Sequence, residues 1–254
     1  MHPILLKIGS LSIYSYGVMV ALGFALATAC VYARAPKFGI DRDSIIDLMI
    51  LMLVSGVAGA RLFYVLQNYG YYLAYPLEVL NLSKGGLVWY GAFIAGLFSS
   101  VVYMKIKRMD FWAAMDLAAP YIALAQAIGR VGCFLNGCCY GIEAPKGCIL
   151  AVGSASDTLL HLPTQLYSAM ALVLIFAVLC VWQSHRRFKG EIFVGYCVLY
   201  SAKRFFMEFL RGDNPRLYLD LTISQVISCA LFALSLSVFI YMAVLWKKKK
   251  SHSI

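Results

Sequence analysis

Seven long apolar stretches divide this chain, and few folds can accommodate them. Each is about as long as the roughly 20 helical residues that cross the hydrocarbon core of a bilayer. Lipid offers no partners to backbone groups, and the stretches lack the alternation of a β-barrel. The charged fraction is 13%, whereas soluble domains carry about 25%. We therefore predict an all-α membrane protein, a seven-transmembrane-helix bundle. The predicted spans are Leu11–Tyr32, Ile45–Leu66, Leu87–Met104, Ala113–Gly132, Thr164–Trp182, Glu191–Leu210 and Leu221–Trp246.

The rest of the chain is too short to form a separate soluble domain. We expect one integral-membrane domain over residues 1–254, multi-pass and with no cofactor. The first apolar stretch is longer than the core of a signal peptide, and Lys7 is the only formal positive charge before it. The tyrosine-rich loop 67–86 is a candidate for a short amphipathic segment in the membrane interface.

The basic residues are distributed unequally between the two sets of loops. Thirteen Lys and Arg residues follow the first, third, fifth and seventh spans, and five lie on the opposite side. The positive-inside rule then places the N-terminus outside and the C-terminus in the cytoplasm. Because this rule accounts for most of the net charge of +10, we do not expect nucleic-acid binding. Loop arginines such as Arg187 are expected to affect little beyond topology.

Several charged residues lie within or at the end of predicted spans, close to the outer face. They are Arg61, Arg130, Arg204, Glu208 and Arg211. Arg204, Glu208 and Arg211 follow i, i+4, i+7 spacing and share one helix face, so Glu208 can pair with either arginine. Charges at this depth usually face the bundle interior and serve a ligand or a pathway. The competing interpretation is that single arginines only reach up to the headgroups.

Spans that begin at the outer face bring neutral hydrogen-bonding groups to the same level. These are Tyr16, Tyr90, Gln165 and Tyr167. Tyrosine alone is ordinary at a membrane interface. Together with the arginines, whose fork fits phosphate, these groups indicate a site for a phospholipid headgroup.

Four cysteines lie at or beyond the outer end of the fourth span. They are Cys133, Cys138, Cys139 and Cys148. Their spacing matches no standard zinc motif, and we expect no metal. A structural disulfide or plain packing, free thiols in the wall of a pocket, and a chemical role all stay open.

Six short motifs resemble those of the prolipoprotein diacylglyceryl transferases. The motifs in this chain are YSYGVM, GARLFYVL, KGGLVWYGAFIAG, GRVGCFLNGCCYG, LPTQLY and RFFMEFLRGD. They follow the family's order over essentially the whole chain. Five positions depart from the family pattern. Tyr90 stands where the family usually has a histidine, Cys133 replaces an asparagine, and Cys138 replaces a glutamate. Leu162 and Ser168 stand in place of a histidine and a glutamate.

The resemblance implies an enzyme of the bacterial cytoplasmic membrane. It would transfer the diacylglyceryl group of phosphatidylglycerol to the lipobox cysteine of a prolipoprotein signal peptide. The implied catalytic residues are Arg130, Arg211, Glu208 and Tyr90. The implied substrate-binding residues are Tyr16, Arg61, Asn136, Arg204, Gln165 and Tyr167. A homologous transferase with a different acceptor, and a non-enzymatic phospholipid-binding or transport protein, are the alternatives.

Overall fold

The computed structural model describes residues 3–8, 11–81, 85–145, 152–153, 160–212 and 221–251. Cys148, Met1 and Ile254 lie outside these residues. The chain divides into two compact units: unit 1 comprises residues 1–31 and 115–254, and unit 2 comprises residues 32–114. The single domain predicted over 1–254 stays a prediction.

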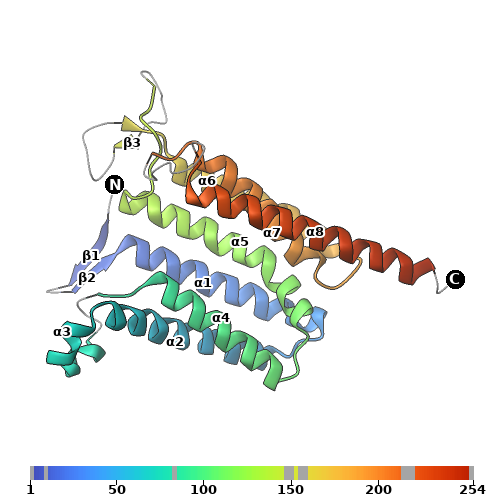
Figure 1. Cartoon of the computed structure of the whole chain (residues 1–254), viewed down its shortest axis with the longest axis horizontal. Helices are drawn as coiled ribbons and strands as arrows, with labels where there is room; N and C mark the ends of the chain where they lie inside the picture. The colour runs from blue at the N-terminus through green and yellow to red at the C-terminus, as the bar shows by residue number, and fades with distance from the viewer. Residues whose placement is uncertain are drawn as a thin grey trace. The chain divides into compact units, whose positions relative to one another are not determined.

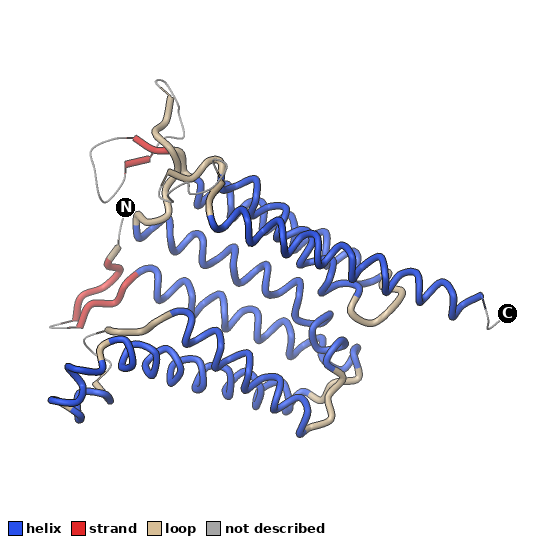
Figure 2. Tube along the Cα trace, viewed as in Figure 1, coloured by secondary structure: helices blue, strands red, loops and turns tan. Residues whose placement is uncertain are grey.

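Helices make up most of the described chain (Figures 1 and 2). They are α1 (Ser15–Arg34), α2 (Arg42–Gln67), α3 (Tyr69–Ala74), α4 (Trp89–Ile106), α5 (Phe111–Asn136), α6 (Thr164–Ser184), α7 (Glu191–Glu208) and α8 (Ile223–Ser251), with short 3-10 turns η1 (Ala35–Phe38) and η2 (Pro76–Leu80). In α3 and η2, Leu73, Leu77 and Leu80 are exposed apolar side chains. The mostly helical, membrane-type fold predicted from the sequence is confirmed.

Two short hairpins accompany the helices. Strands β1 (Ile4–Ile8) and β2 (Leu11–Tyr14) pair antiparallel, with Leu6 opposite Ile13. Strands β3 (Val152–Gly153) and β4 (Leu160–His161) form the second pair. The first helix therefore begins at Ser15 and not at Leu11, because the β-branched and aromatic residues of Leu11–Tyr14 are used in a strand.

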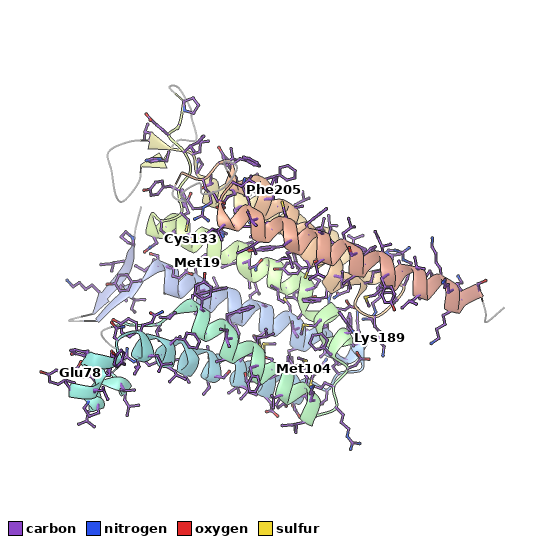
Figure 3. All side chains as sticks on the ribbon, viewed as in Figure 1. Met19, Glu78, Met104, Cys133, Lys189 and Phe205 are labelled. Atoms are coloured by element: carbon purple, nitrogen blue, oxygen red, sulfur yellow. The ribbon has the colours of Figure 1, made fainter. Side chains whose placement is uncertain are left out.

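Six of the described helices are long and apolar enough to cross a membrane: Ser15–Phe38, Arg42–Gln67, Trp89–Ile106, Phe111–Asn136, Thr164–Ser184 and Ile223–Ser251. Large apolar side chains such as Leu22, Leu174 and Ile240 are exposed along them, and Figure 3 draws the side chains on the ribbon. A bilayer would cover these faces. The seventh predicted span, α7, is 18 residues long but holds Glu191, Lys203, Arg204 and Glu208, so seven spans are not confirmed.

Unit 2 is built on close packing between α2 and α4. A Cβ added at Gly59 would lie 2.5 Å from the carbonyl oxygen of Gly91 on the facing helix. Glycine at both positions therefore lets the two backbones approach, as in other membrane helix pairs. A hydrogen bond of 2.7 Å between the Oγ atoms of Ser55 and Ser99 joins the same two helices.

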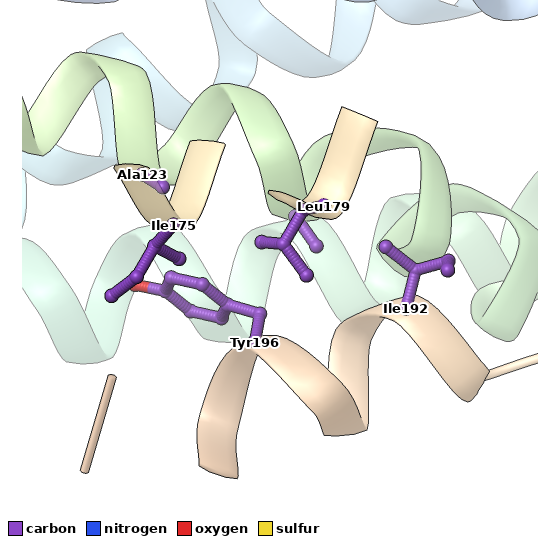
Figure 4. Close-up of a cluster of buried hydrophobic side chains, with 6 residues drawn as sticks. Ala123, Ile175, Leu179, Ile192 and Tyr196 are labelled. Atoms are coloured by element: carbon purple, nitrogen blue, oxygen red, sulfur yellow. The ribbon is translucent and has the colours of Figure 1, made fainter. Parts of the chain in front are cut away.

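In unit 1 the core lies where α5, α6 and α7 meet. Buried side chains from the three helices pack together (Figure 4): Ala119, Ala123, Ile175, Leu179, Ile192 and Tyr196. The Tyr196 hydroxyl donates to Oε1 of Gln126 over 3.0 Å, which satisfies the polar end of a buried ring. α8 packs along α7, and the two run side by side in Figure 1.

Two buried carboxylates hold the α6–α7 turn, and they correct the expectation for Arg187. Asp116 accepts hydrogen bonds from the backbone N–H groups of Gly190, Ile192 and Phe193 at 2.7 to 3.0 Å. Glu191, fully buried, accepts from the Arg187 guanidinium at 2.7 and 3.0 Å. Arg187 is thus the partner of a buried charge, and its loss leaves that carboxylate uncompensated.

Candidate functional site

The site begins where α5 ends. The N–H of Gly137 donates to the carbonyl of Phe134, and that of Cys138 to the carbonyl of Cys133, both at 3.2 Å. Gly137 has φ +75° and Cys139 has φ +60°. Gly137 fits the left-handed conformation that commonly ends helices, whereas Cys139 is a cysteine in a conformation that costs most side chains energy. The chain therefore turns back sharply over the end of α5.

Segments beyond α5 are held against the starts and ends of other unit 1 helices. The Nε2 of Gln165 donates to the Cys138 carbonyl at 2.8 Å, and the Oγ1 of Thr164 to the Cys139 carbonyl at 3.0 Å. Gly141 pairs with Arg211 as an antiparallel bridge. The surroundings of Gly141 leave no room for a side chain, since an added Cβ would lie 2.8 Å from the carbonyl oxygens of Leu162 and Leu210. The ends of α5 and α7 and the start of α6 thus form one connected structure.

A polar network joins the end of α7 to the start of α8. Nη1 of Arg204 lies 3.2 Å from Oε2 of Glu208, and Nη2 donates to Ser224 at 2.9 Å. The Thr222 hydroxyl donates to Oε1 of Glu208 at 2.9 Å. Glu208 and Thr222 are both buried. The ion pair expected from i, i+4 spacing is therefore present, and it also fixes the start of α8.

Four basic side chains of unit 1 gather near this network. The charges of Arg130, Arg204 and Arg211 all act on the Lys203 ammonium. The carboxylate of Glu208 balances the positive charge of Arg204. Arg130 is half-buried, and among the described residues none forms a hydrogen bond or an ion pair with its guanidinium. Such a group of cations is suited to an anionic ligand.

Other predicted site residues of unit 1 lie on the same elements. Tyr16, in the first turn of α1, is partly exposed, and the charge of Arg130 acts on its hydroxyl. An added Cβ at Gly132 would lie 3.4 Å from the Cα of Tyr16, so the small residue brings α1 against α5. Asn136 ends α5 and is half-buried, as is Tyr167 in the first turn of α6.

Gln165 carries a buried acceptor that nothing in the described protein satisfies. The side chain is 1% exposed, and its Oε1 has no hydrogen-bond partner among the described residues. An orphaned buried acceptor costs about 1–3 kcal/mol. A hydroxyl or N–H of a bound substrate would remove this penalty.

Arg61 and Tyr90 belong to unit 2. Arg61 is buried, and its five guanidinium N–H groups all donate to backbone carbonyls at 2.7 to 3.2 Å: those of Glu78, Val79, Asn81, Gly85 and Gly86. These bonds hold the connection between α2 and α4 and leave no guanidinium N–H for a phosphate. Tyr90 is exposed in the first turn of α4, with its ring against Trp89.

The sulfur atoms of Cys133, Cys138 and Cys139 all lie within 4.8 Å of one another. All three residues are half-buried, and Figure 3 places Cys133 near the end of α5 close to Met19 of α1. No disulfide joins them.

Sequence reasoning missed the hydrogen bonds around Thr222. The segment Thr222-Ile-Ser-Gln225 has the spacing of a capping box. Its two reciprocal bonds are present, at 2.9 Å from the Thr222 N–H to Oε1 of Gln225 and at 3.3 Å from the Gln225 N–H to Oγ1 of Thr222. That motif was the signal that could have identified the start of α8. No sequence motif indicates the contact between Thr222 and Glu208.

Comparison with known proteins gives consistent results over almost the whole chain. The family described as prolipoprotein diacylglyceryl transferase matches residues 3–241. A protein of Clostridium tetani is 36% identical over 245 residues, which cover 95% of this chain and 97% of the relative. A protein of Listeria monocytogenes serotype 4a is 32% identical over 252 residues, covering 96% and 91%. One from Bacillus licheniformis is 30% identical over 250 residues, covering 95% and 92%. All three relatives are named phosphatidylglycerol–prolipoprotein diacylglyceryl transferase.

Proposed function

The chain belongs to the prolipoprotein diacylglyceryl transferase family, and we propose that it transfers the diacylglyceryl group of phosphatidylglycerol to a cysteine thiol of a prolipoprotein. The cysteine sulfur forms a bond to the glycerol carbon that carries the phosphate ester. The bond between that carbon and the phosphate ester oxygen breaks, and the electron pair of this bond leaves with glycerol phosphate. The thiol proton passes to a base or to water.

The observation that carries this proposal is the position of Arg130 in the basic cluster. The phosphodiester of the donor has one negative charge, whereas the leaving glycerol phosphate approaches two at neutral pH. A guanidinium aimed at the leaving phosphate stabilises the transition state more than the bound substrate. Arg130 is half-buried and has no anionic partner among the described residues, so its donors are available for this task.

The other unit 1 residues support the same reaction. Arg211 is the second phosphate ligand, since its backbone pairs with Gly141 just beyond the end of α5 and its charge, like that of Arg130, acts on Lys203. Glu208 orients Arg204 through the 3.2 Å ion pair, and Arg204 adds positive charge to the headgroup site. Gln165 Oε1, Asn136, Tyr16 and Tyr167 provide polar contacts to the glycerol and ester groups.

The two unit 2 residues take different roles. Arg61 acts indirectly, by holding the connection between α2 and α4 with its five hydrogen bonds. Tyr90 is the candidate for relaying the thiol proton. A phenol is a weak base at neutral pH, so the contribution of Tyr90 is expected to be smaller than that of Arg130.

The placement of the reaction follows from topology. We infer that α7 crosses the membrane as a seventh span, because its two carboxylates are buried and paired: Glu191 with Arg187 and Glu208 with Arg204. The excess of basic residues in alternate loops puts the N-terminus outside and the C-terminus in the cytoplasm. The site then opens to the outer leaflet of the bacterial cytoplasmic membrane, where a lipobox cysteine of a secreted precursor arrives.

The test is a reconstituted reaction. Purified protein is incubated with labelled phosphatidylglycerol and a lipobox peptide, and thioether-linked lipid is measured by mass spectrometry. We expect diacylglyceryl peptide and glycerol phosphate in equal amounts, and no product with a matched peptide that has serine in place of cysteine. If folded protein releases glycerol phosphate without lipidating the peptide, the acceptor is a different molecule. If it binds the lipid without turnover, the transferase assignment is wrong.

A further inference from the structure

The reaction proposed above makes no use of the three cysteines at the end of α5. Cys133 is in the last turn of the helix, and Cys138 and Cys139 follow it in the loop. Their sulfur atoms nevertheless lie within 4.8 Å of one another. Three thiols gathered to this degree need a physical explanation beyond packing of small apolar side chains.

The local backbone brings the sulfurs together. The Cys138 N–H donates to the Cys133 carbonyl, which keeps the first loop residue over the last helical turn. The left-handed conformations of Gly137 and Cys139, with φ +75° and +60°, then reverse the chain. A non-glycine residue at positive φ is uncommon and costs energy. At Cys139 this strain is what places a third thiol beside the other two.

Hydrogen bonds from α6 fix this loop from outside. Thr164 and Gln165, both buried, donate to the carbonyls of Cys139 and Cys138 at 3.0 and 2.8 Å. Outer contacts of this kind hold the ligands of metal sites in place and tune their affinity. The backbone carbonyls of Cys138 and Cys139 are thus both held by hydrogen bonds from the start of α6.

The distances favour a metal ion over a disulfide. A Zn–S bond is about 2.3 Å, so tetrahedral coordination separates two sulfurs by about 3.8 Å. From at most 4.8 Å, the three thiols reach this geometry with a shift of about 1 Å. A disulfide needs about 2.05 Å between sulfurs and would leave the third thiol unused.

The surrounding charge also suits a metal thiolate. Three thiolates and one divalent cation carry a net charge of −1. The charge of Arg130 acts on Cys133, and Arg130 has no other anionic partner among the described residues. The guanidinium can therefore balance the complex while remaining at the edge of the phosphate site.

We propose that Cys133, Cys138 and Cys139 bind one thiophilic divalent ion of the Zn²⁺ class, with its fourth position open to water. The site stabilises the turn between α5 and α6 and takes no part in breaking the donor lipid. It does not depend on the proposed transferase reaction, because the ligands and the readout are separate from it. The sequence spacing matched no standard zinc motif, since two of the three ligands are adjacent and only the left-handed turn makes them converge.

Metal binding is measured with the purified, reduced protein in detergent. Co²⁺ is added as a spectroscopic probe, and Zn²⁺ is used in competition. We expect one equivalent of Co²⁺ with a thiolate-to-metal charge-transfer band, displaced by Zn²⁺. Cys133→Ser, Cys138→Ser and Cys139→Ser should each weaken binding at least a hundredfold. The matched control is Cys229→Ser, an exposed cysteine of α8, which should bind as the parent does.

A second measurement avoids reliance on variants that fail to fold. Thiols of the parent protein are alkylated with and without Zn²⁺, and each cysteine is quantified by mass spectrometry. Protection of Cys133, Cys138 and Cys139 together, with Cys229 unchanged, supports the site. Equal alkylation with and without Zn²⁺ overturns it. Co²⁺ binding without a charge-transfer band, or recovery of a disulfide among the three from freshly isolated membranes, also overturns it.

Discussion

The hydroxyl of Thr222 donates a hydrogen bond of 2.9 Å to the carboxylate of Glu208, and both side chains are buried. Thr222 also caps α8, while Glu208 ends α7 and pairs with Arg204. This single contact couples the start of one helix to the charge that positions an arginine of the site. The stability of this helix pair and the proposed phosphate site therefore depend on the same carboxylate.

Replacing Thr222 by valine keeps the shape of the side chain but removes this donor. A buried carboxylate that loses a hydrogen bond should cost about 1–3 kcal/mol of stability, and the cap of α8 is lost as well. We expect a clear drop in the unfolding temperature in detergent. Ser237→Ala is the matched control, because its hydroxyl bonds only to a carbonyl of its own helix on an exposed face. Equal unfolding temperatures for the two variants would contradict this role.

Arg130→Lys keeps the charge but loses the two-pronged guanidinium. If Arg130 stabilises the leaving phosphate, the variant should lose about 2–4 kcal/mol of transition-state stabilisation. This corresponds to roughly a thirtyfold to thousandfold fall in turnover, measured with labelled phosphatidylglycerol. Arg42→Ala, an exposed arginine at the start of α2, should retain activity. An active Arg130→Ala protein would remove the physical basis of the phosphate site.

Glu208→Gln should act differently from Arg130→Lys. It retains the size of the side chain and leaves Arg204 without its 3.2 Å partner, so the amount of folded protein should fall together with activity. Folded protein is quantified by size-exclusion chromatography, and turnover is normalised to it. Loss of turnover in a protein of unchanged stability would show that Glu208 acts directly on the substrate.

Gly59→Ala should disrupt the contact between α2 and α4. The added Cβ would lie 2.5 Å from the carbonyl oxygen of Gly91, which forces the helices apart at a cost of about 1–3 kcal/mol. Gly56→Ala, one turn earlier in α2, meets only a carbonyl at 3.7 Å and should be neutral or stabilising. Thermal unfolding of the two variants tests the packing. A Gly59→Ala protein as stable as the parent would show that α2 and α4 can move apart without loss of stability.

Arg187→Ala should destabilise the protein although the residue lies in a loop. Its partner Glu191 is fully buried, and Arg187 itself is half exposed. The expected loss is about 1–3 kcal/mol, less than for a fully buried pair because water reaches the arginine. Unfolding temperatures of Arg187→Ala and Lys248→Ala, an exposed residue of the basic tail, provide the comparison. Equal unfolding temperatures for the two variants would show that Arg187 affects little beyond membrane topology.

The sequence by itself determined the membrane class and the elements that carry the basic residues. Apolar length predicts spanning helices because the bilayer has a fixed thickness, and i, i+4 spacing is enough to pair Arg204 with Glu208. The motif around Arg130, together with five further motifs in the same order, resembles the family that the comparisons then showed. The spans and the ion pair depend on local periodicity and on composition, whereas the family resemblance depends on matching motifs.

Only the tertiary structure decided which partners the polar groups take. Arg61 looks in the sequence like another phosphate ligand, yet its donors are taken by carbonyls 17 to 25 residues away along the chain. The three cysteines match no metal motif in their spacing, yet positive φ angles bring their sulfurs together. Glu208 meets Thr222, 14 residues further along the chain and at the start of the next helix. Periodicity fixes which face of a helix a residue occupies, but the path of the chain between helices sets which groups meet there.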